Sequence, residues 1–430
     1  MKRSWSEFEA YVHETMEKEN IPGAAVAVAE RGRVIYKKGF GYRDIAQKLA
    51  VTSETIFGIA SVTKSFTAAA ILELEKEGKL SVNDPVTKYI PELAIPSLEP
   101  MDEIRIHHLL SHTTGLPPVK RNENLNRLQE HVTYLNAMTH ERLGKPGEYF
   151  SYSNDAFLLL GLIIERVTGR LYRRDMTQRF LDRLAMQRST FNLEEFGKMG
   201  NVTVPYCYNK ETRTYEEQVW PKLGNYAVGG GLRSNVLDLL KFGQLLLREP
   251  YFSRMWRPVH PVFRHTSYGY ALTATPYGGV TLVQHGGSQP GVAANFGLVP
   301  ERQLVIAVLT NASGVPAEEI WLAAANMALG RPLKQKAAVE PEYRLSTREM
   351  ERFLGTYASE EGGRLDIVKE GEKVAAVIGG ERYALRASGP QTLVIKAWEY
   401  PIPFYFDDSG RPWAALFGMR MLRRNKSEKA

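Results

Sequence analysis

A serine and a lysine stand three residues apart at the front of a long apolar segment. Ser61 and Lys64 lie in "FGIASVTKSFTAAAILELEKEG", residues 57–78, which has no proline and no glycine between Gly58 and Gly78. Side chains three apart on a helix share one face, so the hydroxyl and the amine would point into one pocket. Apolar surroundings lower the pKa of a lysine, and a neutral amine accepts a proton from a neighbouring hydroxyl. The pair therefore indicates nucleophilic catalysis by serine, although the same spacing also occurs by chance in helices.

A tyrosine and an asparagine form a second candidate pair. Tyr152 and Asn154 lie in "KPGEYFSYSN", residues 145–154, directly before an apolar helical segment. Functional side chains often sit on such loops, where a rigid scaffold holds them. A tyrosine near Lys64 would share the proton transfer, and the asparagine would orient the lysine and the substrate.

A third candidate group ends a strand late in the chain. His285, Gly286, Gly287 and Ser288 lie in "QHGGSQPG", residues 284–291. The two glycines would let a substrate lie close to the backbone, and the Ser288 amide would donate to an oxyanion. A purely structural histidine at a strand end is the alternative explanation for His285.

Taken together, the three groups resemble the motifs S-x-x-K, Y-x-N and H-x-G of the serine β-lactamase and penicillin-binding protein superfamily. The sequence is most similar to the class C, CubicO-type branch of esterases and peptidases, over roughly residues 5–330. The stretches "IRIHHLLSHTTGLP", "GGLRSN" and "FGLVPERQLVIAVLTN" also look like that branch. The C-terminal segment resembles the lipocalin-like domain attached to some of its members.

The resemblance implies a role for each candidate residue. Ser61 would attack a carbonyl carbon and form an acyl-enzyme. Lys64 and Tyr152 would handle its proton, and which of the two is the main base stays open. The amides of Ser61 and Ser288 would form the oxyanion hole. The remaining residues, Asn154, His285, Gly286 and Gly287, would contact the substrate, and no cofactor is implied.

His285 departs from the β-lactamase pattern. A lysine there would be a permanent cation for a substrate carboxylate, whereas histidine has an unperturbed pKa near 6.5 and is largely neutral at pH 7. His285 should titrate near neutrality unless its pocket shifts its pKa. We therefore expect a peptidase or amidase on small peptides, including peptides with D-amino acids. A carboxylesterase of the same fold is the first alternative, and a β-lactamase or a non-catalytic penicillin-binding protein the second.

Signals for a metal or a nucleotide cofactor are weak. His108 and His112 stand four apart, as zinc ligands on a helix do, but no glutamate completes H-E-x-x-H. No G-x-G-x-x-G follows a predicted strand, and no G-x-S-x-G elbow is present. We expect no metal, no cofactor and no α/β-hydrolase.

The elements around these residues predict an α+β fold. "GAAVAVAE" and "RVIYKKGFGYRD" form a hairpin around residues 31–32, and "GVTLVQHGG", "VAANFGLVP" and "QLVIAVLTN" are consecutive strands. The segment 154–169 reads as a buried helix capped by Asn154 or Asp155 and ended by Gly169. We expect an antiparallel sheet flanked by helices, with a mostly helical subdomain between about residues 80 and 225.

The end of the chain predicts a second, smaller unit. Residues 333–345 look like a proline-bearing linker, and "STRE" at 346–349 is a capping box that opens a short helix. Short strands separated by turns follow, which is typical of a small all-β, barrel-like domain. The expected division is a hydrolase domain at 1–332, the linker, and a lipocalin-like domain at 346–430.

Composition limits the other partners. The 430 residues are 43% hydrophobic, and their 55 basic and 48 acidic residues are interleaved, so we expect no nucleic acid partner. The longest apolar run, "FLLLGLII" at 157–164, is too short to cross a bilayer, so no membrane partner is expected. Cys207 is the only cysteine and no secretory signal is apparent, which favours a cytoplasmic protein. The expected partner is a small-molecule, ester or short-peptide substrate, and a homo-oligomer is left open.

Overall fold

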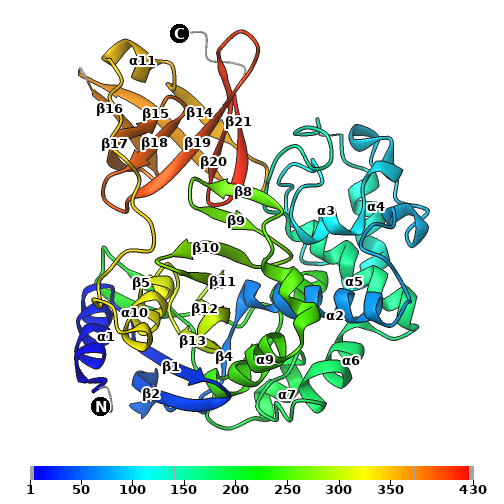
Figure 1. The fold of residues 1–430 in the computed structure, drawn as a ribbon, viewed down its shortest axis with the longest axis vertical. Helices are drawn as coiled ribbons and strands as arrows, with labels where there is room; N and C mark the ends of the chain where they lie inside the picture. Colours follow the sequence, from blue (N-terminus) through cyan, green and yellow to red (C-terminus); the bar gives the residue numbers. More distant parts are fainter. Residues whose placement is uncertain (1–3, 140, 372, 426–430) are drawn as a thin grey trace.

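A mixed sheet-and-helix body carries a small barrel in the computed structural model, which describes residues 4–139, 141–371 and 373–425 (Figure 1). Within these residues, nine strands form an antiparallel sheet in the order β3-β2-β1-β13-β12-β11-β10-β9-β8. The strands are β1 (Gly23–Glu30), β2 (Arg33–Asp44), β3 (Leu49–Ala50), β8 (His260–Phe263), β9 (Thr266–Tyr268), β10 (Thr273–Tyr277), β11 (Val280–Gln289), β12 (Val292–Val299) and β13 (Leu304–Thr310). The predicted α+β fold is confirmed.

Helices cover both faces of the sheet. The alternate residues Ala25, Ala27 and Ala29 of β1 pack into one core, and Ala24, Val26 and Val28 pack into the other. Side chains of a strand alternate between faces, so a strand buried on both sides is apolar throughout, as β1 is. One face packs against α10 (Ala317–Leu329), with α1 (Ser6–Lys18) in the same core, and the other against α9 (Val236–Arg248). The core behind α9 continues into α2 (Thr63–Lys76) and α5 (Asn154–Thr168).

The predicted helical subdomain lies beside α2 and α5. It contains α3 (Ile106–Leu110), α4 (Leu128–Asn136), α6 (Tyr172–Met176), α7 (Leu193–Lys198) and α8 (Ala227–Gly230). Two small strand pairs accompany it, β4 (Phe57–Gly58) with β7 (Arg233–Ser234) and β5 (Tyr206–Asn209) with β6 (Thr214–Glu217). No helix among the described residues is long and apolar enough to cross a membrane.

The start of α5 corrects one prediction. Its N-cap is Ser153, which has an extended backbone and whose hydroxyl accepts a hydrogen bond from the Ala156 amide at 3.1 Å. Asn154 and Asp155 were the predicted caps, but both are already in the helix. The side chain of Asn154 is therefore not used for capping and points to a different partner, described below. Gly169 ends the helix with φ of 68°, as predicted.

The C-terminal part is a closed barrel. Helix α11 (Thr347–Glu351) begins at the predicted capping box of Ser346 and Glu349. In the described residues that follow, eight strands close on one another: β14 (Gly355–Ala358), β15 (Arg364–Glu370), β16 (Lys373–Ile378), β17 (Glu381–Gly389), β18 (Thr392–Ile395), β19 (Tyr400–Phe406), β20 (Pro412–Phe417) and β21 (Arg420–Arg424). Closure leaves no free sheet edge.

The barrel is docked on the larger body through a shared apolar cluster. Leu143, Phe150 and Tyr152 of the body pack with Ala414, Leu416 and Met421 of β20 and β21. The hairpin of β20 and β21 lies beside β8 and β9 in Figure 1. Its backbone is also tied down, because the Tyr152 amide donates to the Met419 carbonyl at 2.8 Å. The hairpin turn is therefore held next to a predicted site residue.

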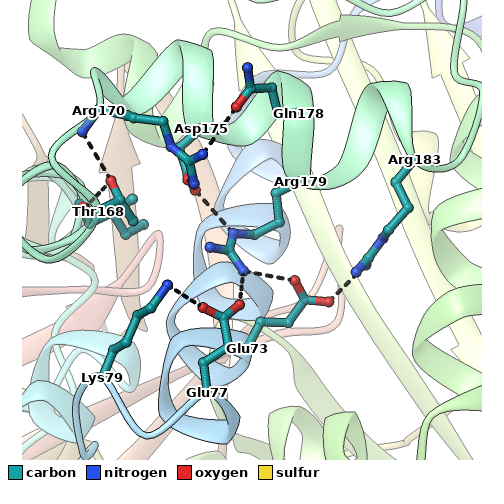
Figure 2. A network of polar contacts seen from close by, with 10 residues as sticks. Glu73, Glu77, Lys79, Thr168, Arg170, Asp175, Gln178, Arg179 and Arg183 are labelled. Atoms are coloured by element: carbon teal, nitrogen blue, oxygen red, sulfur yellow. Dashed lines mark hydrogen bonds and ion pairs between the residues drawn. The ribbon is translucent and has the colours of Figure 1, made fainter.

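A buried charge network joins α2 to the helical subdomain on the side away from the barrel (Figure 2). Arg179, in a π-helical turn over Thr177–Asp182, donates to Asp175 at 3.0 Å, to Glu73 at 3.1 Å and to Glu77 at 2.7 Å. The Asp175 side chain is fully buried and that of Arg179 is 9% exposed. Charges removed from water need partners, so Arg179 neutralises carboxylates that the fold has buried.

We expect Arg179→Ala to lower the free energy of unfolding by about 3–5 kcal/mol, because Asp175 would keep a buried charge with one partner fewer. Arg183→Ala is the control. Arg183 pairs with Glu73 at 2.7 Å, but its side chain is 45% exposed, so its loss should cost about 1 kcal/mol or less. Urea unfolding of both variants measures the difference, and equal losses would contradict the assignment of Arg179 to a buried network.

Candidate functional site

Ser61 lies on a tight turn between a short strand and α2. A single 3-10 turn, Ala60–Val62, leads directly into the helix. Ala60 has φ of 44°, a left-handed conformation that costs a non-glycine residue roughly 1–3 kcal/mol. The Ile59 amide donates to the Leu232 carbonyl at 3.2 Å, which fixes the turn against its neighbour. The fold thus holds Ser61 in a strained, well-defined position.

Lys64 is wholly buried in the first turn of α2. Its Nζ lies 3.3 Å from Ser61 Oγ and 2.9 Å from both Asn154 Oδ1 and the Gly229 carbonyl oxygen. Burial is the largest cause that lowers the Lys64 pKa well below its usual value, and Arg420 and Arg121 lower it further. The carboxylates of Glu361 and Asp155 oppose this shift only in part. Lys64 therefore loses its proton more readily than an exposed lysine does.

Tyr152 is buried beside the lysine. The Lys64 Nζ lies 5.0 Å from the centre of the Tyr152 ring, and the phenol has no hydrogen-bond partner among the described residues. Burial raises the Tyr152 pKa, and the nearby Ser61 hydroxyl and Arg420 only oppose the rise. The ring of His112 packs 4.2 Å from that of Tyr152. Tyr152 is thus a neutral phenol at physiological pH.

His112 belongs to the scaffold of this loop. Its Nδ1 accepts from the Ser153 amide at 3.0 Å, and burial lowers its pKa well below the usual value. His108 uses its own Nδ1 to accept from the Arg105 amide at 3.0 Å. Because each Nδ1 accepts from a backbone amide, the neutral ring carries its proton on Nε2, and neither ring has a lone pair left for a metal in the observed arrangement.

His285 is a neutral residue at the strand edge of the site. Its Nδ1 donates to the Gly286 carbonyl at 2.5 Å, so Nε2 accepts from the Tyr268 hydroxyl at 3.1 Å. The residue is 6% exposed, and burial, with a contribution from the charge of Lys64, lowers its pKa to about 3. The pocket therefore moves His285 away from titration near neutrality, and His285 carries no charge at pH 7.

The two glycines after His285 have different surroundings. A Cβ on Gly287 would lie 2.3 Å from the Ile59 carbonyl oxygen, whereas a Cβ on Gly286 would meet only Ala294 at 3.9 Å. Gly287 is thus required for β11 to approach the turn that carries Ser61. Gly286 is exposed toward the cleft, where the predicted space for a substrate remains.

Two charged residues of the barrel reach the same site. Arg420, at the turn between β20 and β21, places its guanidinium 4.7 Å from the centre of the Tyr152 ring. Its Nε donates to Glu361 Oε2 at 2.8 Å. Glu361, between β14 and β15, accepts from Asn154 Nδ2 at 2.8 Å. A chain of polar contacts therefore runs from the barrel through Asn154 to Lys64.

A cleft of about 680 Å³ opens over Ser61. Its lining comes from the sheet, from the segment that leads to the barrel and from the barrel itself. The lining includes Ser61, Tyr152, His285, Gly286, Gly287, Ser288, Glu318, Glu340, Glu399 and Arg420. The volume suits a small ligand or a short peptide segment.

Comparison with known proteins identifies the family. Residues 8–329 match the sequence profile described as Beta-lactamase. The chain belongs to the β-lactamase family. Protein flp of Staphylococcus aureus (strain MW2) is 36% identical over 193 residues, which are 44% of this chain and 38% of that protein. The chain thus matches about two fifths of the length of that relative.

Other known proteins match along nearly the whole chain. Penicillin-binding protein 4* of Bacillus subtilis (strain 168) is 25% identical over 420 residues, 91% of this chain and 92% of that protein. The structure of the octameric penicillin-binding protein homologue from Pyrococcus abyssi has a TM-score of 0.73, 28% identity and 98% coverage of both chains. SurE, at 22% identity and a TM-score of 0.76 over 98% of both chains, shares the fold.

Six of the eight predicted site residues line this cleft, and Lys64 contacts Ser61 and Asn154, but four contributors were missed. Gly229, Glu361 and Arg420 contact the selected side chains, and His112 supports Tyr152. A Cβ on Gly229 would lie 2.9 Å from Lys64 Nζ, so a side chain there would displace the amine. The contact to Lys64 is made by the backbone carbonyl, which the residue type alone does not reveal. The "GGLRSN" stretch that follows was the one available signal.

Because β11 approaches the turn that carries Ser61 closely, alanine substitution of its two glycines should affect stability unequally. Gly287→Ala should lower the free energy of unfolding by about 1–3 kcal/mol, because its methyl group would collide with a backbone oxygen. Gly286→Ala, in the same strand, should change it by about 0.5 kcal/mol or less. Denaturant unfolding measures both, and a larger effect at Gly286 would show that the turn of Ser61 does not depend on this approach.

The low pKa of His285 predicts a pH dependence of stability. The folded pKa of about 3 lies below the unfolded value of 6.5, so the unfolded chain binds an extra proton between these pH values. The stabilisation is fully present above pH 6.5 and falls by about 1.4 kcal/mol per pH unit toward pH 3. His285→Gln should make the decline shallower in urea titrations at pH 4 to 7, whereas parallel curves would mean that folded His285 is protonated like the unfolded residue.

Proposed function

We propose that the protein is a serine hydrolase that forms an acyl-enzyme on Ser61 and acts on small peptides, including peptides with D-amino acids, as a peptidase or amidase. The observation that carries the proposal is the position of Lys64. Its wholly buried amine lies between Ser61 Oγ, Asn154 Oδ1 and the Gly229 carbonyl. Membership of the β-lactamase family supports the same chemistry.

The contacts of Lys64 favour it as the base. A neutral amine has two N–H groups and one lone pair. Asn154 Oδ1 and the Gly229 carbonyl, both acceptors at 2.9 Å, take the two N–H groups. The remaining tetrahedral position, the lone pair, faces the Ser61 hydroxyl at 3.3 Å. Lys64 then accepts the proton of Ser61 as the oxygen attacks the substrate carbonyl.

Tyr152 suits the opposite role. Its raised pKa keeps the phenol protonated, so it would donate a proton to the leaving group rather than accept one from Ser61. Lys64 would then return the proton to the phenol after acyl transfer. The amides of Ser61 and Ser288 would stabilise the oxyanion, and Gly286 leaves the room in which the carbonyl would lie.

A carboxylesterase is the second candidate. The neutral state of His285 favours it, because no cation at that position would attract the carboxylate of a peptide end or of a β-lactam. A β-lactamase or a non-catalytic penicillin-binding protein is the third, and the names of Penicillin-binding protein 4* and the Pyrococcus abyssi homologue support it. Turnover separates the enzymes from the non-catalytic binding protein, because a binding protein is acylated once and stops.

We also propose how the chain is divided, where it acts and how it assembles. The chain divides into a hydrolase domain at 1–332, a linker at 333–345 and a lipocalin-like domain at 346–430. It acts in the cytoplasm without a cofactor. Its homologue from Pyrococcus abyssi is described as octameric, which supports a homo-oligomer here as well.

Intact-mass analysis with a fluorophosphonate probe tests the nucleophile. The adduct should form on Ser61, and Ser61→Ala should lower kcat on p-nitrophenyl esters or aminoacyl p-nitroanilides by roughly four to six orders of magnitude. Ser65→Ala, in the same helix, is the matched control and should keep the adduct. An adduct on another serine would refute the proposal.

Lys64→Arg tests the base. This variant keeps the charge but offers no neutral amine, so its kcat should fall below about a tenth of the wild-type value.

A further inference from the structure

We infer that Glu361, a residue of the barrel, positions the catalytic machinery by fixing the orientation of the Asn154 side-chain amide. The inference rests on the proposed function, since it concerns how the base of that reaction is aimed. None of the three family-like motifs contains Glu361, which lies 207 residues beyond Asn154. The geometry of the polar chain carries the argument.

The carboxylate of Glu361 leaves Asn154 one orientation. An ionised carboxylate only accepts hydrogen bonds, whereas an asparagine amide has a donor end and an acceptor end that can exchange places by rotation. Asn154 Nδ2 donates to Glu361 Oε1 at 2.8 Å, so Oδ1 is turned to Lys64 at 2.9 Å. Rotation of the amide would bring Oδ1 against the carboxylate, two acceptors facing each other.

This orientation decides where the lysine lone pair points. With Oδ1 toward Lys64, the neutral amine donates one N–H to Asn154 and its lone pair stays directed at Ser61. With Nδ2 toward Lys64, the amide would donate to that lone pair and compete with the Ser61 hydroxyl. Glu361 therefore keeps the base available for the nucleophile.

The structure also holds Glu361 itself in place as an anion. Burial alone would raise the Glu361 pKa, but Arg420 and the hydrogen bond from Asn154 keep it below the usual value. Its side chain is 14% exposed, and Arg420 Nε donates to Oε2 at 2.8 Å. Arg420 in turn lies over the ring of Tyr152. The pair thus bridges the two proton-transfer residues from outside the hydrolase part.

Because of the charges around Lys64, a pH profile distinguishes a positioning role of Glu361 from a purely structural role in holding the barrel in place. Arg420 and Arg121 lower the Lys64 pKa, and Glu361 and Asp155 raise it. The other titratable groups that face it, His112, His285 and Tyr152, are neutral at pH 7. Removing the charge of Glu361 alone should therefore lower the Lys64 pKa. Displacing the barrel should raise it, because Arg420 would leave and water would enter.

The test is kcat/KM of the full-length protein on a neutral p-nitrophenyl ester from pH 4 to 10. Wild type should show a rising limb, where Lys64 loses its proton, and a plateau. Glu361→Gln should lower the plateau about tenfold to a hundredfold, because the base is misdirected, and should move the limb to lower pH. Glu370→Gln is the matched control. It removes an equivalent 2.8 Å Glu–Arg pair, with Arg382, from the exposed surface of the same barrel, and both plateau and limb should stay unchanged.

A double variant in which the amide of residue 154 and the carboxylate of residue 361 exchange places tests the orientation of the Asn154 amide. In Asn154→Asp, the new carboxylate would face Glu361 and activity should fall. Adding Glu361→Gln supplies an amide that donates to residue 154, whose oxygens would again accept from Lys64. The double variant should regain at least tenfold in plateau kcat/KM over Asn154→Asp alone.

Each outcome has one meaning. If wild type turns over no ester, or if Ser61→Ala retains its rate, the proposed function fails. If wild type is active through Ser61 but Glu361→Gln keeps the plateau, only the positioning role of Glu361 fails. A limb that moves to higher pH in Glu361→Gln also overturns it, because that shift reports a displaced barrel and a hydrated Lys64.

Discussion

Burying a charged lysine amine away from water costs several kcal/mol of desolvation free energy. The contacts of Lys64 reduce this cost. Two acceptor oxygens and two aromatic rings, Tyr152 and Phe157, enclose the amine in place of water. These contacts do not replace the full hydration of an ammonium group, so burial still favours the neutral form of Lys64. The tight turn before α2, the glycine that admits β11 and the short helix α8 all serve to bring partners within reach of this one nitrogen.

The electrostatics of the site are divided between two parts of the chain. The sheet-and-helix body supplies Ser61, the Lys64 amine and the neutral His285, whereas the barrel supplies the charged pair Glu361 and Arg420. The apolar cluster that contains Leu416 and Met421 holds the two parts together. A small shift of the barrel would therefore change both the solvation and the local field of Lys64, although no barrel residue belongs to the family-like motifs.

Much of the site was predictable because its motifs are local. Ser61 and Lys64 are separated by less than one helical turn, so their spacing alone indicates a shared direction. Tyr152 and Asn154 lie together in one loop directly before a predicted helix. The hairpin of β1 and β2, the strands β11 to β13 and the turn-rich barrel also follow from hydrophobic period and turn residues. A resemblance to a family then placed these local pieces together.

The remainder depends on contacts between distant segments. The Gly229 carbonyl belongs to the backbone and carries no residue signature. Glu361 and Arg420 look like ordinary surface charges in a β-rich segment until docking buries them against Asn154 and Tyr152. Ser153 was missed as the cap of α5 because three consecutive residues, Ser153, Asn154 and Asp155, all have side chains that cap helices well. Tertiary structure, and not local capping preference, determines that the Asn154 side chain contacts Lys64.

The tie between Tyr152 and Met419 has a consequence for how the molecule comes into being. A ribosome makes the chain from the N-terminus, and domains fold as they emerge. The nine-stranded sheet, in the described part of the chain, has all its strands by Thr310, whereas Glu361 and Arg420 are made later. The nascent sheet-and-helix body therefore lacks the partners that the barrel gives to Tyr152 and Asn154 until the barrel packs against them. Maturation of the site is then a timed event, completed by the last hairpin of the barrel.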